Sequence, residues 1–265
     1  MSHSPALTVM IAAVRKAARG VQRDFGEIAS LQVSQKGPGD FVTAADKKCE
    51  RVLREELAKA RPGYGLLGEE EDETKGTDPD HRFIIDPIDG TSNFMHGIPF
   101  FAVTVALERK GEIVAGVTYN PISDELFHSE RGQGAFMNNK RMRVAARRQL
   151  HEALVSTNIP NFGQKNHVSH RNEIAVLQAK TMGVRALGST ALELAYVAAG
   201  RLDAAWCHDL KPWDMAAGII FVREAGGFIS KVDGEGDPLH AGAYAAGNAD
   251  LLPQLRAALS EARKL

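Results

Sequence analysis

The sequence predicts a layered α/β protein, a single domain over residues 1–265 built from two halves of about 1–148 and 149–265. Apolar residues at helical spacing open the chain, which indicates a long amphipathic helix. Strand-like segments with turns at short intervals follow in the first half and indicate an antiparallel meander. Helical stretches separated by short β-rich pieces fill the second half. No repeat or linker-like stretch interrupts this order.

The expected elements follow from these patterns. The helices share an apolar stripe and are expected over residues 7–28, 43–60, 166–181, 189–199, 213–225 and 249–263. Thr43 and Asp46 form a capping-box pattern at the start of the second helix. The strands share a β-branched or apolar composition and are expected over residues 66–68, 82–85, 101–108, 113–119, 125–129 and 153–157. The strand over 82–85 is expected to end at Pro87, because proline blocks strand continuation.

Composition excludes several classes of protein. The 32 basic and 33 acidic residues nearly cancel, so the chain lacks the overall positive charge of a non-specific nucleic-acid binder. Cys49 and Cys207 are the only cysteines, which argues against thiolate zinc sites, iron–sulfur clusters and disulfide scaffolds. The N-terminus is unlike a signal peptide, and no apolar run is long enough to span a bilayer. We therefore expect a soluble cytoplasmic protein without membrane contacts.

The hexapeptide that begins at Asp86 reads Asp-Pro-Ile-Asp-Gly-Thr and is the most informative segment. Asp86 and Asp89 follow an apolar strand, and the intervening proline stiffens the turn, so the two carboxylates keep a set geometry. Gly90 permits close approach of backbone, and Thr91 opens a helix whose free N–H groups favour phosphate. Because carboxylates repel phosphate, a hard divalent cation such as Mg²⁺ is expected between them. A capped turn without a ligand is the alternative.

Spacing excludes other metal and phosphate motifs at this segment. An EF-hand needs oxygen ligands at alternate positions, aspartyl-nucleophile phosphatases carry Asp-x-Asp-x-Thr, and no P-loop pattern occurs. Two later segments also open helices, one with Asp214 in the first turn and one at Gly188-Ser189-Thr190. Either segment is also typical of ordinary helix capping, so neither is specific alone.

Taken together, three segments resemble the inositol monophosphatase family, specifically its bacterial branch. They are Gly68-Glu69-Glu70, Asp-Pro-Ile-Asp-Gly-Thr-Ser-Asn-Phe over residues 86–94, and Trp-Asp-Met-Ala-Ala-Gly over residues 213–218, in order and at matching separations. The resemblance covers essentially the whole chain. It implies an Mg²⁺-dependent, Li⁺-sensitive phosphatase, a homodimer, and a five-layered α-β-α-β-α sandwich.

The resemblance also implies a role for each site residue. The implied ligands of two or three Mg²⁺ ions are oxygen donors, from Glu69, Asp86, the Ile88 carbonyl, Asp89 and Asp214. Glu69 and Thr91 would position the attacking water, and Asp46 would accept a hydrogen bond from the Thr91 hydroxyl. The implied phosphate and substrate contacts come from Asp89, Gly90, Thr91, Gly188, Ser189 and Thr190. The implied reaction is hydrolysis of myo-inositol 1-phosphate by metal-activated water, without a covalent enzyme intermediate.

Position 207 departs from the family pattern. A glutamate that binds inositol hydroxyls is expected seven residues before Asp214, where this chain has Cys207, a poor hydroxyl acceptor. The contact is then missing or supplied by His208 or Asp209, and Cys207 is expected to be a small buried filler. Lys36 is a further uncertain substrate contact. The substrate preference stays open between inositol monophosphates and the fructose 1,6-bisphosphate, adenosine 3′,5′-bisphosphate and histidinol phosphate that other members of the superfamily hydrolyse.

A run of basic residues supports a different class of function, a binding module. Five positive side chains crowd into residues 140–148, namely Lys140, Arg141, Arg143, Arg147 and Arg148. A solvated hairpin and connector is the interpretation that we favour. The alternative is a docking surface for RNA or for an acidic protein of the transcription machinery.

Overall fold

The computed structural model describes residues 3–27, 33–37, 40–160 and 167–264, with side chains from 3–27, 43–160 and 168–264. The helices are α1 (Pro5–Gly26), α2 (Ala44–Ala60), α3 (Thr91–Met95), α4 (His167–Lys180), α5 (Thr190–Ala198), α6 (Pro212–Glu224), α7 (Pro238–Ala241) and α8 (Leu251–Ala262). Each long helix expected from apolar periodicity is present within a few residues of its expected range. No helix in these described ranges is long and apolar enough to cross a membrane.

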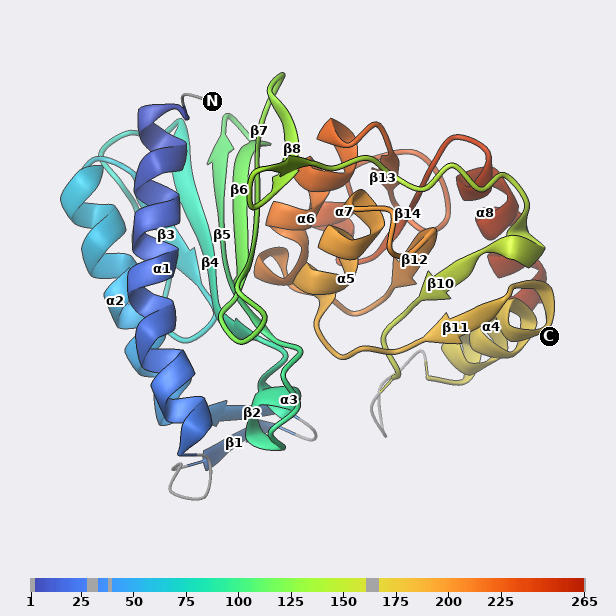
Figure 1. The fold of residues 1–265 in the computed structure, drawn as a ribbon, viewed down its shortest axis with the longest axis horizontal. Coiled ribbons are helices and arrows are strands. Elements are labelled where there is room, and N and C mark those ends of the chain that lie inside the picture. Colours follow the sequence, from blue (N-terminus) through green and yellow to red (C-terminus); the bar gives the residue numbers. More distant parts are fainter. Residues whose placement is uncertain (1–2, 28–32, 38–39, 161–166, 265) are drawn as a thin grey trace.

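A seven-stranded sheet forms the second layer of the molecule. Its strands, in spatial order, are β3 (Gly65–Gly68), β4 (His81–Asp89), β5 (Ala102–Arg109), β6 (Glu112–Asn120), β7 (Glu125–Glu130), β8 (Gly134–Met137) and β9 (Lys140–Arg141). Only the β3–β4 pair is parallel, so the expected antiparallel meander is confirmed. Helices α1 and α2 cover its outer face, where Met10 and Leu53 pack against Phe83 and Val105 in one apolar cluster (Figure 1).

A five-stranded sheet forms the fourth layer. Its strands, in spatial order, are β11 (Gly183–Arg185), β10 (Leu154–Ser156), β12 (Ala204–Cys207), β14 (Tyr244–Gly247) and β13 (Phe228–Ser230). Helices α4 and α8 lie on its outer face and form the fifth layer (Figure 1). A separate two-stranded ribbon joins β1 (Val33–Gly37) and β2 (Asp40–Thr43) ahead of α2.

Helices α5 and α6 lie between the two sheets and complete a five-layered α-β-α-β-α sandwich, which confirms the predicted fold (Figure 1). Their side chains join residues of both sheets, such as Phe127 and Ala246, in one buried cluster. The two helices pack closely at Gly218, where an added Cβ would lie 2.4 Å from Leu194 Cδ1. This close packing fixes the start of α6, and therefore Asp214, relative to the start of α5.

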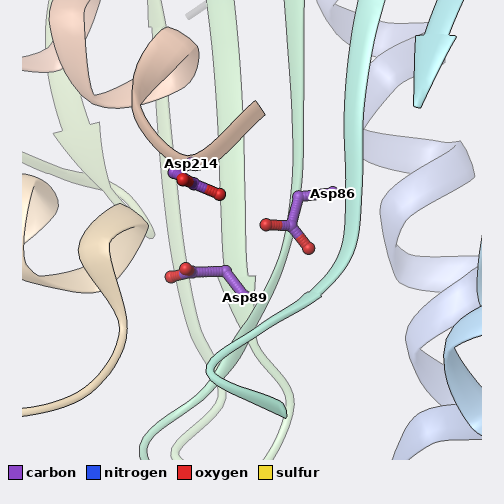
Figure 2. Close-up of side chains that lie close together, drawn as sticks. All are labelled: Asp86, Asp89 and Asp214. Carbon is purple, nitrogen blue, oxygen red and sulfur yellow. The ribbon is translucent and has the colours of Figure 1, made fainter. Parts of the chain in front are cut away.

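Strand β4 differs from its prediction at its end. Pro87 does not terminate the strand, which runs on to Asp89. Asp86 pairs with Thr104 and Asp89 with Ala102, so β4 carries one extra residue between them, a β-bulge. A bulge leaves a residue out of the ladder, so the missing N–H of the proline is tolerated there. Asp86 and Asp89 therefore lie on either side of the bulge, and both are at the same end of β4 (Figure 2).

Candidate active site

Three carboxylates from two layers of the fold meet at the end of β4. Asp86 and Asp89 come from the bulged end of β4, and Asp214 comes from the first turn of α6 (Figure 2). One oxygen of each lies within 4.8 Å of the other two. The backbone N–H of Ile88 donates to Asp86 Oδ1 at 3.0 Å, and that of Lys211 donates to Asp214 Oδ2 at 2.8 Å. Asp214 therefore caps its helix and also belongs to the cluster.

The cluster carries more negative charge than its surroundings stabilise. Burial, and then the neighbouring carboxylates of Glu69, Asp89 and Asp214, raise the pKa of Asp86 well above its ordinary value. Burial raises the pKa of Asp89 to about 6, although hydrogen bonds to its ionised form oppose the shift. Burial and then Asp89 raise the pKa of Asp214 to about 8. A cation among these oxygens would relieve both the burial penalty and the repulsion.

Asp89 is held from the far half of the chain. The hydroxyl of Ser189, the N-cap of α5, hydrogen-bonds to Asp89 Oδ2, and the N–H of Ala191 donates to the same oxygen at 2.8 Å. Gly90 has φ 95°, and an added Cβ there would lie 3.0 Å from the Gly188 carbonyl oxygen. The segment Gly188-Ser189-Thr190 therefore meets the Asp86–Thr91 segment, as the resemblance implied.

Thr91 and Asp46 are brought together as expected. The Thr91 hydroxyl lies 3.2 Å from Asp46 Oδ1 and 3.0 Å from the Ile88 carbonyl oxygen, and it can donate to either. The capping box is confirmed, because Thr43 N donates to Asp46 Oδ2 at 2.9 Å while the Thr43 hydroxyl caps the helix N–H groups. Helix α3 has only five residues, and Gly90 is its N-cap without a side-chain capping bond.

A buried ion pair that was not predicted from the sequence holds the backbone next to Glu69. Glu50 Oε2 accepts from Glu70 N at 2.8 Å, and Glu50 Oε1 accepts from Glu71 N at 3.2 Å and from Arg54 Nε at 2.8 Å. Arg54 in turn donates to the Glu71 carbonyl at 2.9 Å. Both residues lie on α2 and are buried. The detectable signal was a charged pair four residues apart on the buried face of a helix.

A cleft of about 450 Å³ opens over the carboxylates. Its described lining combines the cluster, the start of α3, the start of α5 and the β12–α6 loop. The lining residues with polar side chains are Glu69, Asp89, Thr91, Ser92, Asn93, Asn158, Ser189, Thr190, Glu193, Asp209 and Asp214. Every carboxylate that the resemblance assigned to metal, other than the buried Asp86, therefore faces one cleft.

Glu193 and Asn93 fix the wall of this cleft. Glu193 Oε1 accepts from Leu187 N at 2.9 Å and from Gly188 N at 3.1 Å, and burial raises its pKa to about 7. Asn93 Nδ2 donates to the Leu187 carbonyl at 2.7 Å and to the Phe100 carbonyl at 2.8 Å. Glu193 was missed because its partners are backbone groups, although a glutamate amid the apolar residues of α5 is an unusual choice.

Two expected substrate contacts have different outcomes. Cys207 is fully buried in β12, does not line the cleft, and burial raises the pKa of its thiol. This burial supports the interpretation of Cys207 as a small filler. Lys36 lies in β1, and its side chain is outside the described residues.

Part of the basic run over residues 140–148 forms ion pairs with acidic residues. Arg147 Nη1 lies 2.9 Å from Asp203 Oδ1, and Arg148 Nε lies 3.4 Å from Asp250 Oδ2. Lys140 and Arg141 form the short edge strand β9 and are exposed, as is Arg143. Two of the five positive charges are therefore locally compensated.

The oxygen donors at the site fit a hard divalent cation. Carboxylates that converge within 4.8 Å, together with a backbone carbonyl at Ile88, match the all-oxygen ligand preference of Mg²⁺. The raised pKa values of Asp86, Asp89 and Asp214 show that the protein alone does not stabilise these charges. The donor set therefore fits the metal that the sequence predicted.

A five-layered sandwich with a carboxylate cluster in a cleft beside two helix starts defines a metal-dependent phosphatase. The chain belongs to the inositol monophosphatase family, whose model matches residues 2–264. The recognition from three sequence motifs is therefore confirmed, and so is the prediction of an enzyme that hydrolyses phosphoric monoesters.

Relatives and solved structures agree with this assignment. The chain is 53% identical over 256 residues to the inositol-1-monophosphatase of Rhizobium meliloti, which covers 97% of this chain and 96% of the relative. It is 38% identical over 264 residues to the Nus factor SuhB of Escherichia coli, with 98% and 99% covered. The crystal structure of the extragenic suppressor protein suhB from Bartonella henselae superposes with a TM-score of 0.95 at 50% identity, with 97% and 99% covered.

Proposed function

We propose that the protein is an Mg²⁺-dependent phosphomonoesterase whose substrate is myo-inositol 1-phosphate or a related inositol monophosphate. The observation that carries this proposal is the convergence of Asp86, Asp89 and Asp214 within 4.8 Å, with Asp89 and Asp214 lining the cleft. The 53% identical relative that is named inositol-1-monophosphatase supports the choice of substrate.

In the proposed mechanism, two or three Mg²⁺ ions would be held by Glu69, by the cluster residues Asp86, Asp89 and Asp214, and by the Ile88 carbonyl. When bound, Mg²⁺ would supply a water of lowered pKa and stabilise the leaving oxygen. The Ser189 hydroxyl and Ala191 N–H keep Asp89 ionised and oriented, because both donate to its Oδ2. This arrangement leaves the other Asp89 oxygen for the cation.

The chain's own groups also hold the water and the phosphate. Because the Thr91 hydroxyl donates its proton to Asp46 Oδ1, its oxygen would accept a hydrogen bond from the attacking water and so position that water with Glu69. Gly90 and Thr91 line the same cleft, and their N–H groups would bind phosphate oxygens. Gly188, Ser189 and Thr190 line the same cleft and would contact the remainder of the substrate.

A panel of phosphate esters tests this proposal. We expect phosphate release from myo-inositol 1-phosphate to require Mg²⁺, to stop in EDTA, and to fall when Li⁺ is added. The panel should include fructose 1,6-bisphosphate, adenosine 3′,5′-bisphosphate and histidinol phosphate, ranked by kcat/KM. Unchanged activity in EDTA would contradict the metal mechanism, and a preference for one of the other esters would contradict the assigned substrate.

A second role is favoured by one observation, the 38% identity to a relative named Nus factor SuhB. The surface for such a role would be the uncompensated part of the basic run, Lys140, Arg141 and Arg143. Binding of a labelled RNA at low salt, lost when these three residues are neutralised, would support it.

Sedimentation analysis of the same protein tests whether it is the homodimer that the resemblance implied.

A further inference from the structure

The loop between β12 and α6 places an unused carboxylate in the cleft. Asp209 lines the same cleft as Asp89 and Asp214, and its side chain is exposed. No described residue forms a hydrogen bond or an ion pair with this carboxylate. It lies outside the three-carboxylate cluster, so neither the metal ligands nor the proposed water-positioning residues account for it.

The backbone at Asp209 is fixed in a conformation that few residues adopt. Its φ is 56°, in the left-handed region, where aspartate is among the better-tolerated side chains. The Asn158 side chain holds the preceding residue at both backbone groups: Asn158 Nδ2 donates to the His208 carbonyl at 2.9 Å, and Asn158 Oδ1 accepts from His208 N at 3.3 Å. The carboxylate therefore projects from a braced loop.

A buried glutamate braces this loop from behind. Glu173, fully buried on α4, lies 2.7 Å from His208 Nε2 and accepts from Trp206 Nε1 at 3.0 Å. Arg263 Nε donates to its other oxygen at 3.2 Å. The His208 ring is thus engaged with Glu173. His208 and Asp209 were the two residues expected to supply the hydroxyl contact in place of a glutamate at position 207. Of these two, only Asp209 presents a free acceptor to the cleft.

We propose that Asp209 determines substrate specificity by accepting hydrogen bonds from the hydroxyl groups of a neutral polyol monophosphate. A carboxylate is a strong acceptor for vicinal hydroxyls and repels a second phosphate on the same substrate. The described lining supports this preference, because it contains no lysine or arginine that would attract a second phosphate. The inference rests on the proposed phosphatase function and names the substrate class of that site.

The test compares substrates with and without hydroxyls beside the phosphate. Asp209→Gly tolerates the left-handed backbone and removes the acceptor. We expect kcat/KM for myo-inositol 1-phosphate to fall roughly tenfold, mainly through KM, while p-nitrophenyl phosphate hydrolysis is unchanged. Asp209→Asn removes only the charge and should raise activity on fructose 1,6-bisphosphate relative to the monophosphate.

Further variants separate a specific role from a general one. Glu173→Gln loosens the His208 contact and should shift the substrate ratio in the same direction as Asp209→Gly, by less. Asp233→Asn alters an exposed aspartate of another loop and should leave the ratio unchanged. An equal loss on both substrates in Asp209→Gly, or no change in their ratio, overturns the specificity role while the phosphatase proposal stands. Wild-type protein that hydrolyses neither substrate overturns both.

Discussion

Glu50→Gln tests whether the buried pair on α2 sets the geometry of the acidic loop. The substitution preserves the size of the side chain but removes its charge, so Arg54 loses its buried counter-ion at 2.8 Å. The glutamine amide also places an N–H donor where a carboxylate oxygen accepts from the N–H of Glu70 or Glu71. The change therefore affects both the ion pair and the loop that begins at Glu69.

The expected loss is large because the carboxylate is fully buried. Breaking a buried ion pair by removing one partner costs about 3–5 kcal/mol, and the amide retains part of the hydrogen bonding, so we expect a loss of about 3 kcal/mol. For a chain of this size, that corresponds to a fall in Tm of roughly 6–12 °C. We also expect the Mg²⁺ concentration for half-maximal activity to rise, since Glu69 is displaced.

Thermal unfolding and Mg²⁺ titration of phosphate release measure these two effects. Glu56→Gln is the matched control, because Glu56 lies on the same helix in an exposed pair with Lys16, and such pairs contribute little. Equal effects of the two variants on Tm would refute the role of burial. A lower Tm in Glu50→Gln with an unchanged Mg²⁺ midpoint would refute the role of Glu50 in positioning the loop.

Three further predictions follow from the described contacts. Asp214→Asn should reduce Mg²⁺-dependent phosphate release by roughly a hundredfold or more. It should raise Tm in EDTA above about pH 8, where Asp214 is ionised, because it then removes a charge that raises the pKa of Asp86; a lower Tm under these conditions would contradict the repulsion. Gly218→Ala should lower both Tm and activity, since its Cβ would overlap Leu194 and separate α5 from α6; a variant crystal structure with unshifted helices would contradict this. Burial, and then the charge of His208, lower the pKa of His170 from 6.5 to about 4, so the unfolded chain binds more protons between these pH values. The contribution of His170 to the free energy of unfolding should therefore fall by about 3 kcal/mol as pH decreases from 6.5 to 4. Urea denaturation of the wild type and of His170→Asn should differ in pH dependence by this amount, and identical pH dependence of the two proteins would contradict the role of His170.

The sequence predicted those features that depend on local patterns. The capping box at Thr43 and Asp46 is a contact over three residues, and the helices follow from apolar periodicity. The motif at Asp86 predicted a divalent cation because spacing and composition alone bring its acids together. The end of β4 was predicted wrongly, since a bulge that accommodates Pro87 depends on the neighbouring strand and leaves no pattern in one sequence.

Side chains that form hydrogen bonds with distant backbone groups could not be predicted from the sequence. Glu50 binds N–H groups twenty residues away, and Glu193 binds a turn whose position is set by Asn93 of the other half. Because every residue except proline has a backbone N–H, hydrogen bonds to these groups leave no pattern of residue types in the sequence. The burial of Cys207 and the place of Asp209 in the lining of the cleft could be seen only in the three-dimensional arrangement.

The central layer has a consequence for how the chain folds. Strands β4 to β8 are complete by Met137, yet the helices that cover their inner face, α5 and α6, lie at residues 190–224 (Figure 1). The bond between Asp89 and Ser189 likewise closes a separation of 100 residues. During synthesis the first sheet therefore emerges with an apolar face that nothing in the preceding chain can cover. Translation that stalls before α5 leaves that face open to other nascent chains, so aggregation of interrupted products is the intrinsic hazard of this layer order.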